Sequence, residues 1–226
     1  MIDIDHLKYL ANENRKRIIN MIYEAKSGHE GGSLSIIDML TAIYEIDVNF
    51  AEEQRSKVVL SKGHTVPALY AVLNSKGIIK DEEMKTLRFI NSRLQGHPYT
   101  GTIPEVDATT GLLGQGLSIA VGMAIAKRNK NDNHHVYAIV GDGEMQEGQI
   151  WEAAMFAAQH KLSNVIAFTD YNKLQLDGPI SEICDIAPLD EKWRAFGWNA
   201  INVKNGHNCD EIDAAIKLAK FSDKPS

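Results

Sequence analysis

The sequence has few cysteines and no long apolar run. Its 226 residues include only two cysteines, Cys184 and Cys209, and this number excludes a disulfide framework or a cysteine metal cluster. No apolar stretch approaches the ~20 residues that a transmembrane helix needs. The first residues lack the basic and then apolar pattern of a secretory signal peptide. We therefore expect a cytoplasmic protein that does not bind membranes, with both thiols reduced.

An excess of positive charge is also missing. The 24 Lys and Arg residues are outnumbered by 30 Asp and Glu residues, so the formal net charge is −6. This balance provides no general attraction to nucleic acid or to anionic lipid. The length and a hydrophobic content of 44% fit one α/β domain, spanning 1–226, with a full core. We find no internal repeat, low-complexity segment or interdomain linker.

The chain is organised around residues 135–178. The β-rich apolar run 136–140 predicts a buried strand, and 165–169 predicts a second one. An amphipathic helix is expected between them, from about 149 to 162. Such a crossover makes the two strands parallel and neighbours in the sheet. We therefore expect an α/β fold with an open, mostly parallel sheet that is flanked by helices on both faces.

Two polar residues follow these two strands. Asp142 lies within Gly-Asp-Gly after the first strand, and Asn172 follows the second strand. Ligands of open α/β sheets bind outside the carboxyl ends of the strands, so both side chains are expected at one rim. With the backbone carbonyl of Leu174 they offer hard oxygen ligands, suited to Mg²⁺ or Ca²⁺. Gly143 lets the backbone approach an anion closely, so a Mg²⁺–diphosphate site is the resulting hypothesis. The alternative is that Gly-Asp-Gly is only a turn.

The other expected elements surround this centre. A loop without periodicity covers 92–112, and a glycine-rich loop covers 28–33. A helix rich in small residues is expected to begin at the run from Gly111 to Gly116. Further helices are expected at 4–26, 34–45, 67–75, 81–91, 188–196 and 210–221, and further strands at 58–60 and 199–203.

Four of the eight histidines follow a glycine: His29, His64, His97 and His207. A single loop histidine is more often just solvated, but His64 follows a predicted strand at the same rim as Asp142. His29 and His97 lie in glycine-rich loops with no evident structural role, and imidazole suits hydrogen bonding to sugars and proton transfer near neutral pH. Three histidines are expected to be structural: His207, before a helix cap, and His134 and His135, at the opposite sheet edge.

The central motif resembles that of a known family. Gly141-Asp142-Gly143 with an asparagine thirty residues after the aspartate is similar to the thiamine diphosphate signature. The longer run Gly-Asp-Gly-Glu-Met-Gln-Glu-Gly-Gln-Ile-Trp-Glu-Ala resembles transketolases in particular. The resemblance covers essentially the whole chain, but only the diphosphate-binding, amino-terminal domain of a full transketolase.

This resemblance implies roles for several residues. Asp142, Asn172 and Leu174 would hold the cation of thiamine diphosphate, and Gly143 would lie at its diphosphate. Gly111 and Leu113, in a Gly-x-x-Gly-Gln-Gly motif, would touch the cofactor. The histidines of the matching motifs line the channel to the cofactor and contact the donor ketose or the diphosphate. That implies catalytic positions for His29 and His97, and a catalytic and cofactor-binding position for His64.

Two positions need separate comment. Gly28-His29-Glu30-Gly31 has glutamate where the family usually has proline, so this loop departs from the family pattern but keeps its histidine. Glu147 would join a carboxylate network across a dimer interface and so act in both catalysis and cofactor binding. Its simpler interpretation is a glutamate that stabilises a helix amino terminus by ~1 kcal/mol or less.

The resemblance also implies a partner. In transketolases the glutamate that contacts the aminopyrimidine ring lies in a separate pyrimidine-binding domain, which we do not find in this sequence. The chain is therefore either the amino-terminal subunit of a split transketolase or a fragment of a longer protein. In the first case a carboxyl-terminal subunit would supply the pyrimidine domain, in a homodimer or heterotetramer that transfers a two-carbon ketol unit between phosphosugars.

Other functions remain as alternatives. The α subunit of 2-oxoacid dehydrogenases shares the Gly-Asp-Gly and asparagine pattern, and deoxyxylulose-phosphate synthase shares the general plan. The Gln146-Glu147-Gly148 and Gly114-Gln115-Gly116 runs favour a transketolase. A non-catalytic binding protein that kept the fold is the alternative from a different class, and the retained Asp142 and histidines argue against it.

Overall fold

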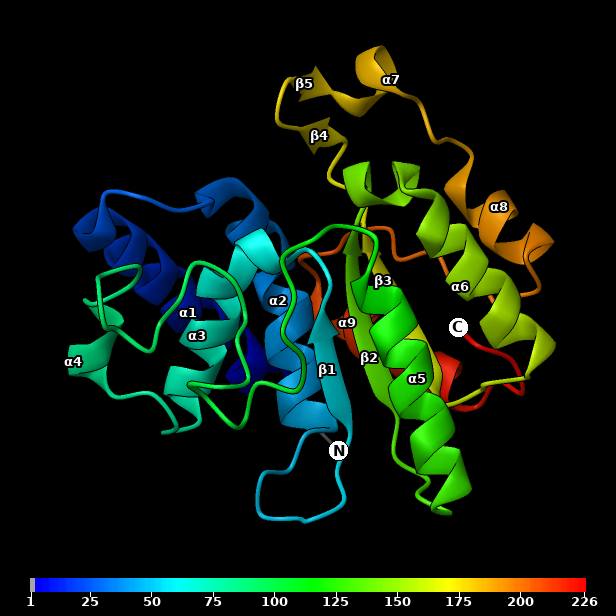
Figure 1. The fold of residues 1–226 in the computed structure, drawn as a ribbon, viewed down its shortest axis with the longest axis horizontal. Helices are drawn as coiled ribbons and strands as arrows, with labels where there is room; N and C mark the ends of the chain where they lie inside the picture. Colours follow the sequence, from blue (N-terminus) through cyan, green and yellow to red (C-terminus); the bar gives the residue numbers. More distant parts are fainter. Residues whose placement is uncertain (1–2) are drawn as a thin grey trace.

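A computed structural model describes residues 3–226, in which three strands form a central parallel sheet. The strands β1 (Lys57–Leu60), β2 (Val136–Gly141) and β3 (Val165–Asp170) lie in the order β1-β2-β3. Leu60 pairs with Ile139, and Gly141 pairs with Asp170. All three carboxyl ends point to the top of Figure 1. The prediction that β2 and β3 are parallel neighbours is confirmed.

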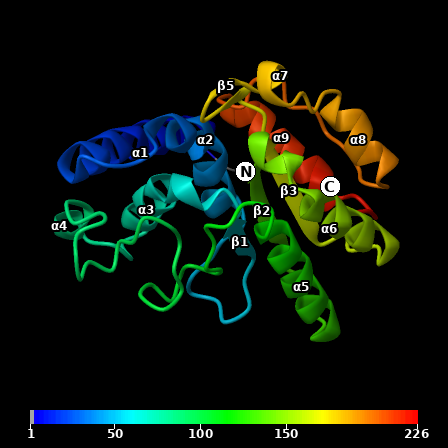
Figure 2. The same cartoon turned by 45° about the horizontal axis from the view of Figure 1, so that its top comes forward.

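Helices cover both faces of this sheet. They are α1 (Ile4–Ala25), α2 (Glu30–Ile46), α3 (Val66–Ser75), α4 (Asp81–Met84), α5 (Gly116–Asn129), α6 (Gly148–Gln159), α7 (Ile180–Ile183), α8 (Leu189–Ala195) and α9 (Cys209–Lys220). Figures 1 and 2 both place α1–α3 on one side of the strands and α5 and α6 on the other. Alternate residues of β2 belong to different cores: Tyr137 and Ile139 pack with α1, α2, α3 and α9, whereas Val136, Ala138 and Val140 pack with α5, α6 and α8. The α/β fold class is therefore confirmed.

Short elements lie at the carboxyl ends of the strands. The 3₁₀ turn η1 (Gly63–Thr65) follows β1, and η2 (Gly143–Gln146) follows β2. Beyond β3, the two-residue strands β4 (Leu174–Gln175) and β5 (Gly178–Pro179) form a hairpin at the top of Figure 1. These three elements surround the rim that the sequence indicated as the site.

Several predicted boundaries were wrong. The loop expected at 28–33 is mostly the first turn of α2, because both the backbone N–H and the hydroxyl of Ser33 donate to the carbonyl of His29. The helix expected at 81–91 ends at Met84, and Arg88 and Asn91 have left-handed backbone conformations with φ of 62° and 67°. Such residues interrupt a right-handed helix.

The strand expected at 199–203 is absent from the described residues. Its place beside β3 is taken by Ser226, whose N–H donates to Val165 and whose carbonyl accepts from Ala167. The backbone N–H of Asn199 donates to the carbonyl of Pro225 at 2.9 Å, and its Nδ2 donates to Oγ of Ser226 at 3.1 Å. This segment therefore bonds to the chain end rather than to a continuous strand. Within residues 3–226, no helix combines the length and apolar character needed to cross a membrane.

Candidate cofactor and substrate site

Asp142 lies directly beyond β2 and is almost fully buried. Its Oδ1 accepts from the backbone N–H of Gly143 at 2.8 Å, and its Oδ2 accepts from that of Lys173 at 2.6 Å. The N–H of Asp142 in turn donates to the carbonyl of Asp170 at 3.1 Å. These bonds join the loops that leave β2 and β3, so the Asp142 carboxylate lies against the loop that contains Asn172.

Asn172 is half-buried in that loop, and both ends of its amide are bonded. Its Oδ1 accepts from the N–H of Leu174 at 2.9 Å, and its Nδ2 donates to Oδ2 of Asp170 at 3.1 Å. The tertiary structure therefore brings Asp142 and Asn172 to the same rim. Their roles as metal ligands stay a prediction.

The oxygen atoms at this rim fit a hard divalent cation. Leu174 faces Pro179 in the β4–β5 hairpin, and because proline has no N–H this partner cannot donate to the Leu174 carbonyl. A carboxylate, an amide oxygen and a backbone carbonyl are the ligand types that Mg²⁺ and Ca²⁺ prefer. Burial raises the pKa of Asp142, and a bound cation would oppose that shift by stabilising the carboxylate.

Gly143 lies in the turn η2 rather than directly in a long helix. A Cβ atom at this position would lie 3.0 Å from Oε1 of Gln175, so a larger residue would require the Gln175 side chain to shift by a few tenths of an ångström. Among the described residues, no group of three or more His, Cys, Asp or Glu side chains is arranged to hold a metal. The oxygen set at this rim is of a different kind, since only one of its three members is a carboxylate.

Three of the histidines come together from separate segments. His29 precedes α2 and His64 lies in η1, and their ring centroids are 5.1 Å apart in an edge-on arrangement. His97 lies in the long loop, where a Cβ on Gly111 would be 3.2 Å from its Cγ. Nη2 of Arg88 lies 3.5 Å from Nδ1 of His29. The three predicted catalytic histidines therefore form one group, with Gly111 at its edge.

The environment keeps these histidines uncharged at neutral pH. Burial, followed by the charge of Lys62, lowers the pKa of His64 to about 4. Burial and then the charge of Arg88 lower the pKa of His29 and that of His97. A neutral imidazole presents one donor and one acceptor nitrogen. Three such rings suit the recognition of a substrate with several hydroxyl groups.

The Gly111–Gly116 run forms a loop in front of α5. Gly114 has φ of 86°, and a Cβ there would lie 2.8 Å from Cβ of Glu147, so a side chain at this position would clash as well as strain the backbone. Leu113 and Glu147 are both exposed, the latter directly before α6. Neither contacts the histidine group in a hydrogen bond that the described residues show.

Sequence reasoning missed a buried carboxylate next to Asp142. Glu144 accepts from the hydroxyl of Ser61 and from the N–H groups of Gly114 and Gly141, at 2.9 and 3.1 Å. It thus ties the exits of β1 and β2 to the glycine loop, and burial raises its pKa. Sequence reasoning considered Asp142, Gly143 and Glu147 in this run and gave Glu144 no role, although the resemblance motif includes it.

A buried ion pair was also missed. Nζ of Lys62 lies 2.5 Å from Oδ2 of Asp170, and both side chains are less than a tenth exposed. Lys62 follows β1 and Asp170 ends β3. Their signal in the sequence was the one used for Asp142, a polar residue at the end of an apolar strand.

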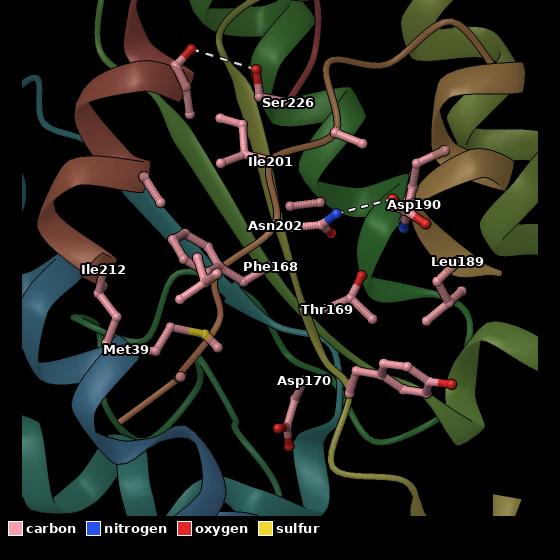
Figure 3. Close-up of a pocket in the computed structure, with 18 of the residues that line it drawn as sticks. Met39, Phe168, Thr169, Asp170, Leu189, Asp190, Ile201, Asn202, Ile212 and Ser226 are labelled. Carbon is pink, nitrogen blue, oxygen red and sulfur yellow. Dashed lines mark hydrogen bonds between the residues drawn. The ribbon is translucent and has the colours of Figure 1, made fainter. Parts of the chain in front are cut away.

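A cavity of about 610 Å³ lies along the outer edge of β3, between this strand and the segment 199–203. Figure 3 shows Phe168, Thr169 and Ile201 around it, with Asp170 at its lower end. The cavity reaches Asn172, but the three grouped histidines do not line it. The histidine group and the cavity are therefore separate features.

The histidines interpreted as structural have acidic partners. Nδ1 of His207 lies 2.8 Å from Oδ2 of Asp38, and Nδ1 of His134 lies 2.7 Å from Oδ1 of Asp132. His134 and His135 precede β2, at the end of the sheet opposite Asp142. This arrangement fits their interpretation as structural residues.

Comparison with known proteins agrees with this architecture. Residues 7–226 match the family described as transketolase, thiamine diphosphate binding domain. The chain is 47% identical to the 6-deoxy-6-sulfo-D-fructose transketolase subunit SqwG of Clostridium sp. (strain MSTE9), with 97% of this chain and 82% of the relative covered. It is 38% identical to an apulose-4-phosphate transketolase subunit of Phocaeicola vulgatus, with 99% and 80% covered.

Solved structures show the same fold. The transketolase of Campylobacter jejuni superposes with a TM-score of 0.90 at 33% identity, covering 99% of this chain and 37% of that one. For the Leishmania mexicana transketolase the TM-score is 0.91 at 30% identity, with 97% and 35% covered. The chain thus spans about a third of these transketolases and matches one domain of them. On the sequence match and the shared fold together, the chain belongs to the transketolase family and contains its thiamine diphosphate-binding domain.

Proposed function

We propose that this chain is the amino-terminal subunit of a split, thiamine diphosphate-dependent transketolase. The assembled enzyme would transfer a two-carbon ketol unit between phosphosugars. The observation that carries this proposal is that Asp142 and Asn172 follow neighbouring parallel strands at one rim, where the loop of Asn172 bonds to Asp142, while His29, His64 and His97 form a group. Two relatives, of whose length the chain covers 82% and 80%, are themselves called transketolase subunits.

In this proposal the rim of the sheet holds the cofactor by its diphosphate. Asp142, Oδ1 of Asn172 and the carbonyl of Leu174 would bind Mg²⁺ or Ca²⁺, and Gly143 would allow the diphosphate to approach the backbone. Gly111 and Leu113 would touch the cofactor from the loop before α5. When bound, thiamine diphosphate supplies the electron sink that cleavage beside a ketose carbonyl requires.

The histidines would act on the substrate. The guanidinium of Arg88 only donates hydrogen bonds, so the nearby Nδ1 of His29 is an acceptor and its proton lies on Nε2. Nε2–H of His29 can therefore donate to a substrate oxygen. His64 and His97, which are also neutral, would bind hydroxyl groups or exchange a proton at the same place.

A second polypeptide would complete the site with a pyrimidine-binding domain. Large apolar side chains are exposed around the rim: Leu112, Leu113, Leu174 and Leu176. Such side chains are more typical of an interface than of a free surface. Glu147, exposed beside them, would join the carboxylate network between active sites in a homodimer or heterotetramer.

The alternatives receive less support. A 2-oxoacid dehydrogenase α subunit or a deoxyxylulose-phosphate synthase would share the fold, but the family match and the relatives are transketolases. A non-catalytic protein would have no need for three neutral histidines beside the predicted cation site. The relative at 47% identity is named for a sulfonated ketose, so we propose a donor ketose whose far end has a phosphate or a sulfonate group.

Ketol transfer by purified proteins tests the proposal. The chain by itself should show no turnover with ketose phosphates or with 6-deoxy-6-sulfofructose, and addition of a partner with a pyrimidine domain should produce it. The control is that partner by itself. Turnover by residues 1–226 without a partner would contradict the split-subunit proposal, and turnover of a 2-oxoacid instead of a ketose would favour the dehydrogenase alternative.

A further inference from the structure

The side chain of Asp170 accepts three hydrogen bonds at the rim, although none of the assigned roles uses it. It ends β3 and is almost fully buried. Its Oδ1 accepts from the hydroxyl of Ser35 in α2 at 2.6 Å, and its Oδ2 accepts from Nζ of Lys62 at 2.5 Å. In Figure 3 its carboxylate points away from Thr169 and the upper part of the cavity. Contacts from Ser35 in α2 and from Lys62 beyond β1 therefore fix this carboxylate in place.

The same carboxylate controls Asn172. An amide has one donor end and one acceptor end, whereas a carboxylate only accepts. Because Nδ2 of Asn172 donates to Oδ2 of Asp170 at 3.1 Å, the amide oxygen must lie at the other end. That oxygen accepts from the N–H of Leu174. The neighbouring residue of the same loop, Lys173, donates its N–H to Asp142. A rotated amide would turn its NH₂ group to that side and lose both bonds.

Lys62 makes this arrangement compatible with Asp142. Two buried carboxylates at one rim would repel each other, and the ammonium of Lys62 neutralises Asp170. Asp142 then remains as the anionic group at the rim. Partners that hold a ligand in the correct orientation contribute strongly to metal affinity, and their loss typically weakens it ten- to a hundredfold.

We propose that Asp170, held by Lys62 and Ser35, is a positioning residue that presents the side-chain oxygen of Asn172 to the divalent cation. This inference rests on the proposed function, because it assumes the cation site at Asp142 and Asn172. It predicts that the Asp170 carboxylate is needed only while residue 172 is an amide. A carboxylate at position 172 would present an oxygen to the cation in either orientation of the side chain.

Titration of Mg²⁺ into the full chain, assembled with its partner and with thiamine diphosphate present, tests this by calorimetry. Asp170→Ala should weaken Mg²⁺ binding about ten- to a hundredfold. Adding Asn172→Asp to that variant should recover most of the loss, because the new carboxylate needs no orienting partner and can pair with Lys62. If the unpaired Lys62 prevents folding, Lys62→Met is combined with both variants. Asp47→Ala removes a similarly bonded carboxylate at the opposite end of β2 and should leave Mg²⁺ affinity unchanged.

The outcomes separate this inference from the proposed function. Wild-type affinity in Asp170→Ala, or a folded double variant that recovers nothing, would overturn the positioning role. If Asp142→Ala loses cation binding in the same experiment, the proposed cation site is retained and only the role of Asp170 fails. If Asp142→Ala binds Mg²⁺ as tightly as the wild type, both the cation site and this inference are wrong.

Discussion

The carboxylate of Asp107 connects the long loop of the site to the sheet, and its removal should be strongly destabilising. Its Oδ1 accepts from Nη2 of Arg55 at 2.8 Å and from Nζ of Lys57 at 2.9 Å. Its Oδ2 accepts from Nη1 of Arg55 at 3.0 Å and from the N–H of Val58 at 2.9 Å. The side chain of Asp107 is 1% exposed and that of Arg55 is 8% exposed. Asp107→Ala therefore leaves a buried guanidinium without its counterion.

The size of the effect follows from this burial. Breaking a buried ion pair by removing one partner costs about 3–5 kcal/mol. In a chain of this length each kcal/mol lowers the melting temperature by roughly 2–4 °C, so we expect a decrease of roughly 6–20 °C. His97 and Gly111 lie in the same loop, which is also held by the hydroxyl of Thr110 on the carbonyl of Leu60. Cofactor affinity in the assembled enzyme should therefore fall together with stability.

Urea unfolding followed by circular dichroism measures the change in free energy. Combining Asp107→Ala with Arg55→Met should restore part of the stability, because the double variant no longer buries an unpaired charge. Glu13→Gln breaks the exposed pair with Lys16 and is the control, with an expected change of about 0.5 kcal/mol or less. A loss below about 1 kcal/mol for Asp107→Ala would refute the reasoning, because the ion pair would then contribute no more than a surface pair does.

Three further predictions address the site. In the assembled enzyme, Asp142→Ala should abolish Mg²⁺-dependent binding of thiamine diphosphate in calorimetry; unchanged affinity would contradict the metal assignment. The pKa of His64 is lowered to about 4 in the folded state. The unfolded chain binds this proton more readily, so the free energy of unfolding decreases as the pH falls from 6.5 toward 4. When the pH is lowered to 5, His64→Asn should therefore lose about 1 kcal/mol less unfolding free energy than the wild type, after a discount for the partial exposure of the ring. An equal loss for both proteins in urea titrations would show that the pKa shift is absent. Gly114→Ala should cost about 1–3 kcal/mol because of its positive φ and the contact with Glu147, whereas Gly122→Ala, with open space around it in α5, should stabilise by about 0.5–1 kcal/mol; the reverse order of the two variants would contradict this account.

The centre of the fold was predictable because it depends on local patterns. Two apolar strands joined by one helix must lie parallel, and in most such units they are neighbours. This rule is sufficient to bring Asp142 and Asn172 to one rim, thirty residues apart in the sequence. The position of His64 followed from the same argument, since it comes directly after β1.

The errors occurred where specific hydrogen bonds override the structure that the composition of a segment suggests. The glycines after Gly28 suggested an open loop, but Ser33 closes the first turn of α2 on His29. The apolar segment 199–203 has the composition of a strand, yet it pairs with nothing continuous because the edge of β3 is occupied by Ser226. A strand requires a partner, and the partner is not encoded in the segment itself.

By itself, the sequence determined the parallel order of the central strands and the rim at which their polar residues meet. These follow from the apolar, β-rich composition of the strand segments and from the geometry of a crossover helix, both of which are properties of short segments. Only the tertiary structure decided that His29, His64 and His97 form one group, and that Lys62 and Asp170 are a buried pair that fixes Asn172. Those relations join loops from distant parts of the chain, and their distances are set by how α2, the long loop and the strand ends pack together.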